Sequence, residues 1–490
     1  MKQDQRNKGA ILKERGRTTP KAVGLGRRER LPSAETSSQD VIGASVEAGL
    51  SSRRTFLRGA TGAAALVAGS GSAFARDQWW KDVFNDNRGG PSKPAARAKR
   101  QAAPLNDLRP GKIPWRSDEM LAAMDRAIEK YEEIALDGDW PQVPSGRLIR
   151  VGEYDDRVPL LRRRLAVSGE LSARHAAAYR GSLEFDRYLD LAVRQFQEAH
   201  GLSVRGFLNR STRAQLNITA RERLGQLRLN RSRIARLVNG RIEDRYVLVN
   251  AAGYQLEAVH RFEVQQRHRV IVGKPDRQTP EIQATVLGLN FFPYWRVPKS
   301  IAVKDVVPRL RKEPDYLSKE HIMPRLGSYD GDAIDPETID WNNFDPDRIK
   351  FRQEPGPWNA LGLVRINMPN KEIVYLHDTP LKPLFKQRMR AFSAGCVRVE
   401  DVMELVAWIA RYQPGFEQPL DTVEQIIDGQ QPVDVKLNQP VPVYFTYITA
   451  WAEADGSVVF RPDVYGRDGS AALRGERDPD DPPPSFTLSP

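Results

Sequence analysis

The chain has 490 residues, of which 40% are hydrophobic, so it has room for two or three domains with cores of their own. Its formal net charge is +12, but residues 1–75 carry 13 Lys/Arg against 6 Asp/Glu, which leaves the remainder only mildly basic. No arginine-rich helix or aromatic RNA motif accompanies this charge, so nucleic acid is not expected as a partner, and a single cysteine excludes a disulfide framework or a cysteine-cluster metal site.

Residues 1–75 end in paired arginines, a short apolar run and small residues. Ser52-Arg53-Arg54-Thr55-Phe56-Leu57 precedes about ten modestly apolar residues, and Ala73-Phe74-Ala75 follows as an A-x-A cleavage pattern. This arrangement resembles a twin-arginine signal peptide, which predicts periplasmic export and cleavage after Ala75. Because the apolar run is short and glycine-rich, we expect no transmembrane segment in the mature chain.

A linker and a helical segment follow the signal. Residues 76–112 are mostly Pro, Gly, Ala and charged residues without periodicity, a composition that predicts a disordered linker. Residues 113–154 contain apolar residues at helical spacing between Ser117 and Leu136, and Asp137-Gly138-Asp139 ends the pattern. We interpret residues 113–154 as a helical scaffold.

Residues 155–220 are predicted to form a compact helical module. Helical apolar spacing recurs in three segments, residues 158–165, 186–200 and 209–217. Ala192-Val193-Arg194-Gln195-Phe196-Gln197, followed by His200-Gly201-Leu202 and Gly206-Phe207-Leu208, resembles the three-helix peptidoglycan-binding domain. The resemblance implies peptidoglycan as a partner and makes residues 168–181 an insertion.

A predicted connecting helix over residues 221–243 leads into a region dominated by strand signals. The helix carries an apolar stripe with arginines opposite, typical of a solvated helix that packs one domain on the next. The strand signals are residues 246–250, 255–262, 268–273, 283–290, 362–368, 372–377, 433–437, 441–449 and 458–461. We therefore predict an α+β multidomain protein with a mostly antiparallel sheet, curled or sandwiched.

Two stretches break this strand pattern. Residues 297–355 consist of charged helical pieces and turns, which indicates an insertion between strands. Residues 466–490 end in a run rich in Asp and Pro and are predicted to be a disordered tail.

The single cysteine lies in Ser393-Ala394-Gly395-Cys396-Val397-Arg398, nineteen residues after His377. His377 ends the apolar run 373–376, which predicts a buried strand, and residues 400–412 have helical spacing. A thiol just ahead of a helix N-terminus would be stabilised as a thiolate, and a nearby imidazole could take its proton. Spacing alone also allows a structural cysteine and a structural histidine.

His377-Asp378-Thr379 and the run around Cys396 together resemble the signature of the L,D-transpeptidase (YkuD-type) catalytic domain. Segments 272–280, 293–298 and 352–357 resemble the large periplasmic members. The likeness extends from about Tyr246 to Gly466, and more loosely back to Pro141, and places the catalytic domain at residues 244–465. The resemblance implies a β-sandwich catalytic domain and makes residues 297–355 a helical capping subdomain over the active-site groove.

The resemblance also assigns roles to individual residues. Cys396 would be the acyl-accepting nucleophile and His377 its base and later acid. The Gly395 backbone would donate to the oxyanion, and Ser393 would support the loop or the imidazole. Arg398 would pair with a substrate carboxylate or brace the loop, and Tyr375 would line the groove. The role of Asp378 stays open.

The implied reaction is acyl transfer between peptidoglycan tetrapeptide stems, without a metal or other cofactor. Cys396 would form a thioester with the third stem residue, normally diaminopimelate, and release D-alanine; a diaminopimelate amine of a second stem would then form a 3→3 cross-link. An L,D-carboxypeptidase or a hydrolase of protein–wall links could use the same pair, and a non-catalytic peptidoglycan-binding protein is a further alternative. The acceptor stays open between wall stem, wall-linked lipoprotein and water.

Overall fold

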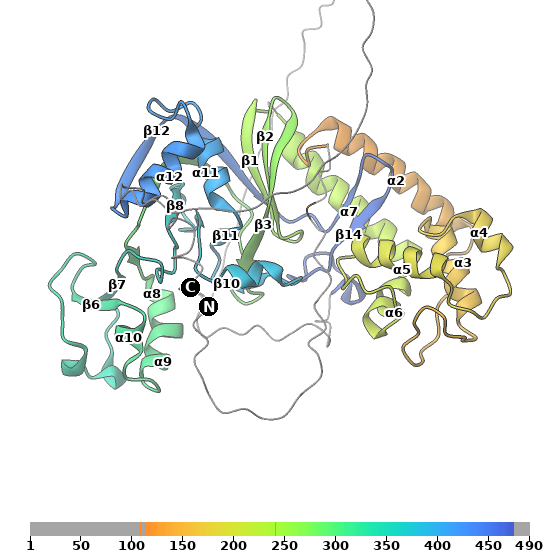
Figure 1. Cartoon of the computed structure of the whole chain (residues 1–490), viewed down its shortest axis with the longest axis horizontal. Helices are drawn as coiled ribbons and strands as arrows, with labels where there is room; N and C mark the ends of the chain where they lie inside the picture. The colour runs from red at the N-terminus through yellow and green to blue at the C-terminus, as the bar shows by residue number, and fades with distance from the viewer. Residues whose placement is uncertain (1–107, 109–112, 241, 475–490) are drawn as a thin grey trace, which may run out of the picture. The chain divides into compact units, whose positions relative to one another are not determined.

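The computed structural model describes residues 108, 113–240 and 242–474 (Figure 1), which all belong to one compact unit, Arg97–Pro490. The expected signal peptide at residues 1–75 and the linker at 76–112, except for Leu108, lie outside the described residues. None of the helices in the described part of the chain combines the length and the apolar character that crossing a membrane requires.

Two long helices form the scaffold beside the sheet. Helix α2 (Asp118–Leu136) begins at Ser117, whose hydroxyl accepts from the Met120 N–H, and α7 (Ala220–Val238) begins with a capping box at Thr219. Their apolar faces share one core with a hairpin of β13 (Ala450–Ala452) and β14 (Val458–Phe460). Helices therefore form in both of these segments, where the periodicity predicts them.

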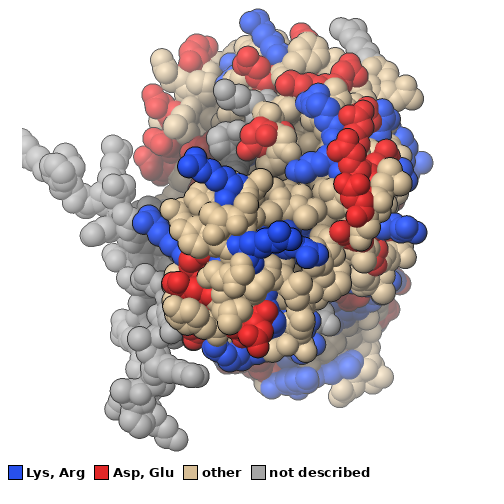
Figure 2. Space-filling model, turned by 90° about the vertical axis from the view of Figure 1, so that its right-hand side faces the viewer, with Lys and Arg blue, Asp and Glu red and all other residues tan. Residues whose placement is uncertain are grey.

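The region between these two helices is helical and has its own apolar core, built around Leu165, Leu189 and Phe196. Its helices are α3 (Val158–Ser168), α4 (Ala173–Ala178), α5 (Arg187–Ala199) and α6 (Arg210–Leu216). Three of them lie where the periodicity predicts helices, and α4 forms inside the predicted insertion at residues 168–181. The side of the molecule that carries this module shows both signs of charge interspersed (Figure 2).

In the described part of the chain, nine strands form the main sheet, in the order β10-β3-β11-β9-β8-β4-β12-β1-β2, and β2 also pairs with β3, so the sheet closes on itself. Three pairs are parallel (β1–β12, β3–β10 and β9–β11) and the other pairs are antiparallel. The mostly antiparallel sheet is therefore confirmed. Its strands are β1 (Arg245–Asn250), β2 (Gln255–His260), β3 (Glu263–Gly273), β4 (Gln283–Phe291), β8 (Val364–Asn367), β9 (Leu376–His377), β10 (Ala391–Ser393), β11 (Val397–Val399) and β12 (Val433–Thr446).

Helix α11 (Val402–Ala410) fills the main core together with the inward side chains of the strands, and α12 (Pro419–Gly429) packs beside it. Most of α11 is buried, as expected for a helix that is apolar on nearly every side. It comes directly after β11, so the strand that follows Cys396 is held on this core.

The insertion has a core and a small sheet of its own, in the order β5-β7-β6. Short helical turns surround this sheet, and η1 among them is a π-helix. The elements are β5 (Trp295–Arg296), α8 (Lys299–Ile301), η1 (Ala302–Val306), α9 (Val307–Leu310), α10 (Tyr316–Lys319), β6 (Ile322–Leu326), η2 (Pro336–Thr338), η3 (Trp341–Asn343) and β7 (Ile349–Gln353).

Three local predictions were wrong. The strand predicted over residues 372–377 is reduced to Leu376–His377, because Ile373 has φ +56° and its side chain is 71% exposed. The two strands predicted at 433–437 and 441–449 are one irregular strand, β12. Residues 466–474 of the predicted tail are ordered, since the buried carboxylate of Asp468 pairs with Arg233. The rest of the tail, residues 475–490, lies outside the described residues.

Candidate active site

Strands β9 and β11 bring the predicted catalytic residues onto one face of the sheet. They pair in parallel, with Leu376 opposite Val397 and His377 opposite Arg398. Leu376 and Val397 point into the main core. Because side chains alternate along strands, His377 and Arg398 point away from that core, and Cys396, one residue before β11, lies on their side.

Cys396 is partly exposed, and its thiol donates to the backbone carbonyl of Ile373 at 3.9 Å. Burial raises the pKa of this thiol, whereas the backbone N–H and the phenol of Tyr375 act in the opposite direction. The expected helix N-terminus does not follow the cysteine, since β11 intervenes and α11 begins only at Val402. The prediction of a dipole-stabilised thiolate was therefore wrong, and the resting group is a protonated thiol.

His377 is 2% exposed, and its Nδ1 has no hydrogen-bond partner among the described residues. Burial and, next, the positive charge of Arg398 lower the pKa of His377 to about 3. Its imidazole is therefore neutral at pH 7 and able to accept a proton. A neutral thiol and a neutral imidazole on the same face of the sheet fit general-base activation during attack rather than a preformed ion pair.

Ser393 fixes the turn that carries the cysteine. Its buried hydroxyl accepts from the Gly395 N–H at 3.1 Å and donates to the Cys396 carbonyl at 2.5 Å. Gly395 has φ +127°, a conformation that only glycine adopts readily. The Gly395 N–H, which we expected to donate to the oxyanion, therefore already has an acceptor.

Sequence reasoning missed Thr279, which braces the same turn from the loop after β3. Its buried hydroxyl accepts from the Gly273 N–H and donates to the Gly395 carbonyl, both at 2.9 Å. Tyr465 completes the brace, because its phenol donates to the Gly273 carbonyl and accepts from the Thr279 N–H. A Cβ at Gly273 would lie only 2.1 Å from the Arg277 carbonyl oxygen, so the turn requires glycine at this position. Gly273 was therefore the sequence feature that could have pointed to this brace.

Two charged residues close to the candidate catalytic pair in the chain, Arg398 and Asp378, are buried. Arg398 has no exposed surface, so it does not reach a substrate carboxylate, and burial lowers its pKa to about 10. The carboxylate of Asp378 accepts from the Leu363 N–H at 3.0 Å and pairs with Lys382. Asp378 therefore braces the turn before β8.

Tyr375 is partly buried between the site and the insertion. Its ring lies 5.7 Å from the His377 ring, and a side-chain hydrogen bond joins it to Trp295. Tyr375 and Ala394 both pack on the core of the insertion. Arg277, in the loop after β3, binds Asp305 of η1 with two hydrogen bonds, one of 2.8 Å. The insertion thus contacts three chain segments around the site: the residue before β9, the turn that carries Cys396 and the loop after β3.

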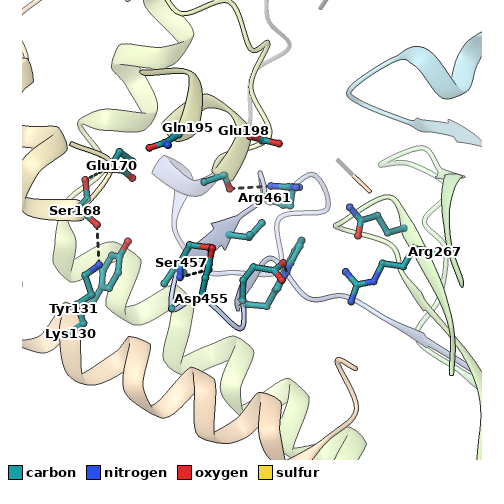
Figure 3. Close-up of a pocket in the computed structure, with 18 residues that line it drawn as sticks. Lys130, Tyr131, Ser168, Glu170, Gln195, Glu198, Arg267, Asp455, Ser457 and Arg461 are labelled. Carbon is teal, nitrogen blue, oxygen red and sulfur yellow. Dashed lines mark hydrogen bonds between the residues drawn. The ribbon is translucent and has the colours of Figure 1, made fainter. Parts of the chain in front are cut away.

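A cavity of about 360 Å³ lies away from this site, between α2, α5 and the β13–β14 hairpin (Figure 3). Its charged lining is largely committed to the protein: Lys130 donates to the Ser168 carbonyl, Arg461 to the Ala199 carbonyl, and Arg267 pairs with Glu257. Across the described residues, His, Cys, Asp and Glu side chains form no group of three or more that could hold a metal ion.

Residues 244–441 match the family model of the YkuD-type L,D-transpeptidase catalytic domain. Over 225 residues the chain is 33% identical to a Haemophilus influenzae protein named as a candidate L,D-transpeptidase, a match that covers 45% of this chain and 44% of the relative. The chain thus spans less than half of the length of that relative.

Two solved structures give weaker similarities. An L,D-transpeptidase from Mycobacterium smegmatis aligns over 41% of this chain and 58% of its own, with 14% identity and a TM-score of 0.20. The Ldtfm–avibactam carbamoyl enzyme aligns over 67% of this chain and 98% of its own, with 10% identity and a TM-score of 0.21. TM-scores this low do not establish a shared fold.

Proposed function

We propose that the chain joins peptidoglycan stem peptides through a thioester on Cys396, because residues 244–441 match the family model of the YkuD-type L,D-transpeptidase catalytic domain. The sulfur attacks the carbonyl carbon of the third residue of a tetrapeptide stem, and the bond to the terminal D-alanine breaks. His377 takes the thiol proton and gives it to the leaving amine. A diaminopimelate amine of a second stem then attacks the thioester, restores the thiol and leaves a 3→3 cross-link.

The observation that carries this proposal is that His377 on β9 and Cys396, one residue before β11, lie on the same face of the sheet, and that Cys396 is partly exposed. The neutral state of both groups supports it, because a base must be unprotonated to accept the thiol proton. Arg398 and Ser393 support the site from within the protein and need no contact with substrate.

Other parts of the chain have supporting roles in this proposal. The insertion caps the groove and limits hydrolysis of the thioester, a role supported by its contacts with Tyr375 and Ala394. The helical module at residues 155–220 holds the chain on peptidoglycan. Residues 1–75 direct the protein to the periplasm by the twin-arginine route, where a wall-linked lipoprotein could also serve as acceptor.

Purified tetrapeptide muropeptides test the reaction. Incubation with the protein should yield a cross-linked dimer and free D-alanine by mass analysis, and C396A and H377A should abolish the dimer. H260A serves as the matched control, because His260 pairs with Glu263 at the opposite end of β3 from the Gly273 turn and its replacement should leave the dimer yield unchanged. Tripeptide without dimer would identify the carboxypeptidase instead, and sacculus binding without any product would identify the non-catalytic alternative.

The nucleophile is tested separately by exposure to a carbapenem. The intact mass of the wild-type protein should increase by one drug molecule, whereas C396A should stay unmodified because the chain contains no other cysteine. Modification of C396A would contradict the assignment of Cys396.

A further inference from the structure

The turn that precedes β9 is closed by one side chain. The amide nitrogen of Asn370 donates to the carbonyls of Met368 and Val374, both at 2.6 Å, and its amide oxygen accepts from the Val374 N–H at 3.1 Å. These bonds fix both ends of the turn, so the backbone at Ile373 has little freedom to relax.

Ile373 occupies a conformation that β-branched residues avoid. Its φ is +56°, where a side chain branched at Cβ crowds its own backbone, and such conformations cost about 1 to 3 kcal/mol. The side chain is 71% exposed, so burial of an apolar group does not compensate for this cost. The Asn370 clamp is the feature that holds the strained residue in place.

The strained backbone directs the Ile373 carbonyl at the nucleophile, and Cys396 Sγ donates to that oxygen at 3.9 Å. A carbonyl accepts a hydrogen bond from a thiol but repels a thiolate, so this contact favours the protonated sulfur. The neighbouring charged and titratable groups are the phenol of Tyr375, the guanidinium groups of Arg365 and Arg398, and the His377 imidazole on the same face. The Ile373 carbonyl opposes ionisation of the thiol by direct contact, whereas the N–H and the phenol of Tyr375 favour the thiolate.

We propose that Asn370 and Ile373 are positioning residues for Cys396: the Asn370 clamp holds the Ile373 carbonyl as the resting acceptor of the thiol proton, and the sulfur leaves this acceptor when His377 takes the proton. The inference rests on the proposed function for its catalytic meaning. The exposed Ile373 side chain gives an incoming stem peptide direct access to the turn, so substrate contact can move the carbonyl away from the sulfur.

The pH dependence of alkylation tests the inference on the full chain. Because Cys396 is the only cysteine, its reaction with iodoacetamide can be followed by intact mass, and the rate reports the thiolate fraction. N370A should lower the pH midpoint of alkylation by about half a unit or more, because an unclamped turn withdraws the carbonyl from the thiol. N343A is the matched control: Asn343 also bonds within an exposed turn, to Asp340, and its replacement should leave the midpoint unchanged.

I373G separates the carbonyl from the side chain. Glycine adopts a positive φ without strain and keeps the carbonyl in place, so the midpoint should equal that of the wild type. An unchanged or raised midpoint in folded N370A, or a fall in I373G as large as the fall expected for N370A, would overturn the inference. If N370A does not fold, N370S takes its place, because serine retains one donor and one acceptor. The alkylation midpoint of N370S should fall by less than that expected for N370A, and an unchanged midpoint would overturn the inference equally.

Alkylation requires no wall substrate, so its outcome is independent of the muropeptide assay. A shifted midpoint in N370A without dimer formation by the wild type would support the positioning role and reject the transpeptidase. Dimer formation with an unchanged midpoint in N370A would support the transpeptidase and reject the positioning role.

Discussion

His377 and Arg398 occupy opposed positions on β9 and β11, and both are buried. A second positive charge beside the Arg398 guanidinium is unfavourable, which is one reason why the pKa of His377 falls to about 3. A base with so low a pKa is a weak proton acceptor, so in the proposed mechanism His377 takes the thiol proton only as the sulfur attacks the carbonyl carbon.

Ser393 is the residue whose removal should affect this turn most. S393A leaves the Gly395 N–H and the Cys396 carbonyl without their partner in a buried turn, which should lower the free energy of unfolding by about 2 to 3 kcal/mol. Acylation of Cys396 by a carbapenem should slow by about tenfold to a hundredfold, since the sulfur loses its fixed position. Urea unfolding and acylation rates measure the two effects.

The control for this prediction is S232A. Ser232 is exposed on α7, where its hydroxyl donates to the Arg228 carbonyl, so its loss should change neither the unfolding free energy nor the acylation rate measurably. Equal effects of S393A and S232A would show that the Ser393 hydroxyl does not hold the turn.

At the scale of elements, periodicity predicted the long strands and failed at the short ones beside the site. Strands β1, β2 and β4 have six or more residues, so a β-branched or alternating run was visible in the sequence. Strands β9 and β11 have two and three residues and exist because they pair with neighbours distant in the chain. The motif identified His377 and Cys396, but the thiol contact with the Ile373 carbonyl, the bonded Gly395 N–H and the turn at Ile373 depend on that pairing and could not be predicted.

The insertion is joined to the catalytic domain by the ion pair of Arg277 with Asp305, which is only partly exposed and makes two hydrogen bonds. R277A should therefore loosen the insertion and increase amide hydrogen exchange over residues 297–355 by about tenfold, since charged hydrogen bonds of this kind contribute about 1.5 to 3 kcal/mol. The proposed capping role predicts that a looser insertion admits water, so the ratio of hydrolysed to cross-linked product should rise in the muropeptide assay.

R296A provides the comparison within the same insertion. Arg296 pairs with Asp330, but both side chains are largely exposed, and such pairs contribute at most about 1 kcal/mol. Exchange rates and product ratios in R296A should match those of the wild type. Unaltered exchange in R277A would show that the Arg277–Asp305 pair does not hold the insertion.

At the scale of the whole molecule, buried polar contacts join segments that are far apart in the sequence. Arg233 of α7 binds the carboxylate of Asp468, which also accepts from Thr449 and Gln226. Glu257 of β2 is fully buried and accepts from the Trp115 N–H and from Arg267. Because these contacts join the helical segments to the sheet, we expect the described residues to unfold together rather than domain by domain.

Glu257 gives this coupling a dependence on pH. Burial raises the pKa of its carboxyl to about 7 in the folded protein, from the ordinary value of 4.5. The folded state therefore binds the proton more tightly than the unfolded state, so the carboxyl makes its most favourable contribution below about pH 4.5. That contribution falls as pH rises from about 4.5 to about 7 and is constant above this range.

The variant E257Q tests this dependence on pH. Its glutamine does not titrate, so the unfolding free energy of the wild type minus that of E257Q should decrease by about 2 to 3 kcal/mol between pH 4.5 and 8. Urea unfolding at four pH values measures this difference, and the fixed effect of removing the partner of Arg267 cancels from its slope. A difference that is flat or increases with pH would show that Glu257 is ionised in the folded protein well below pH 7.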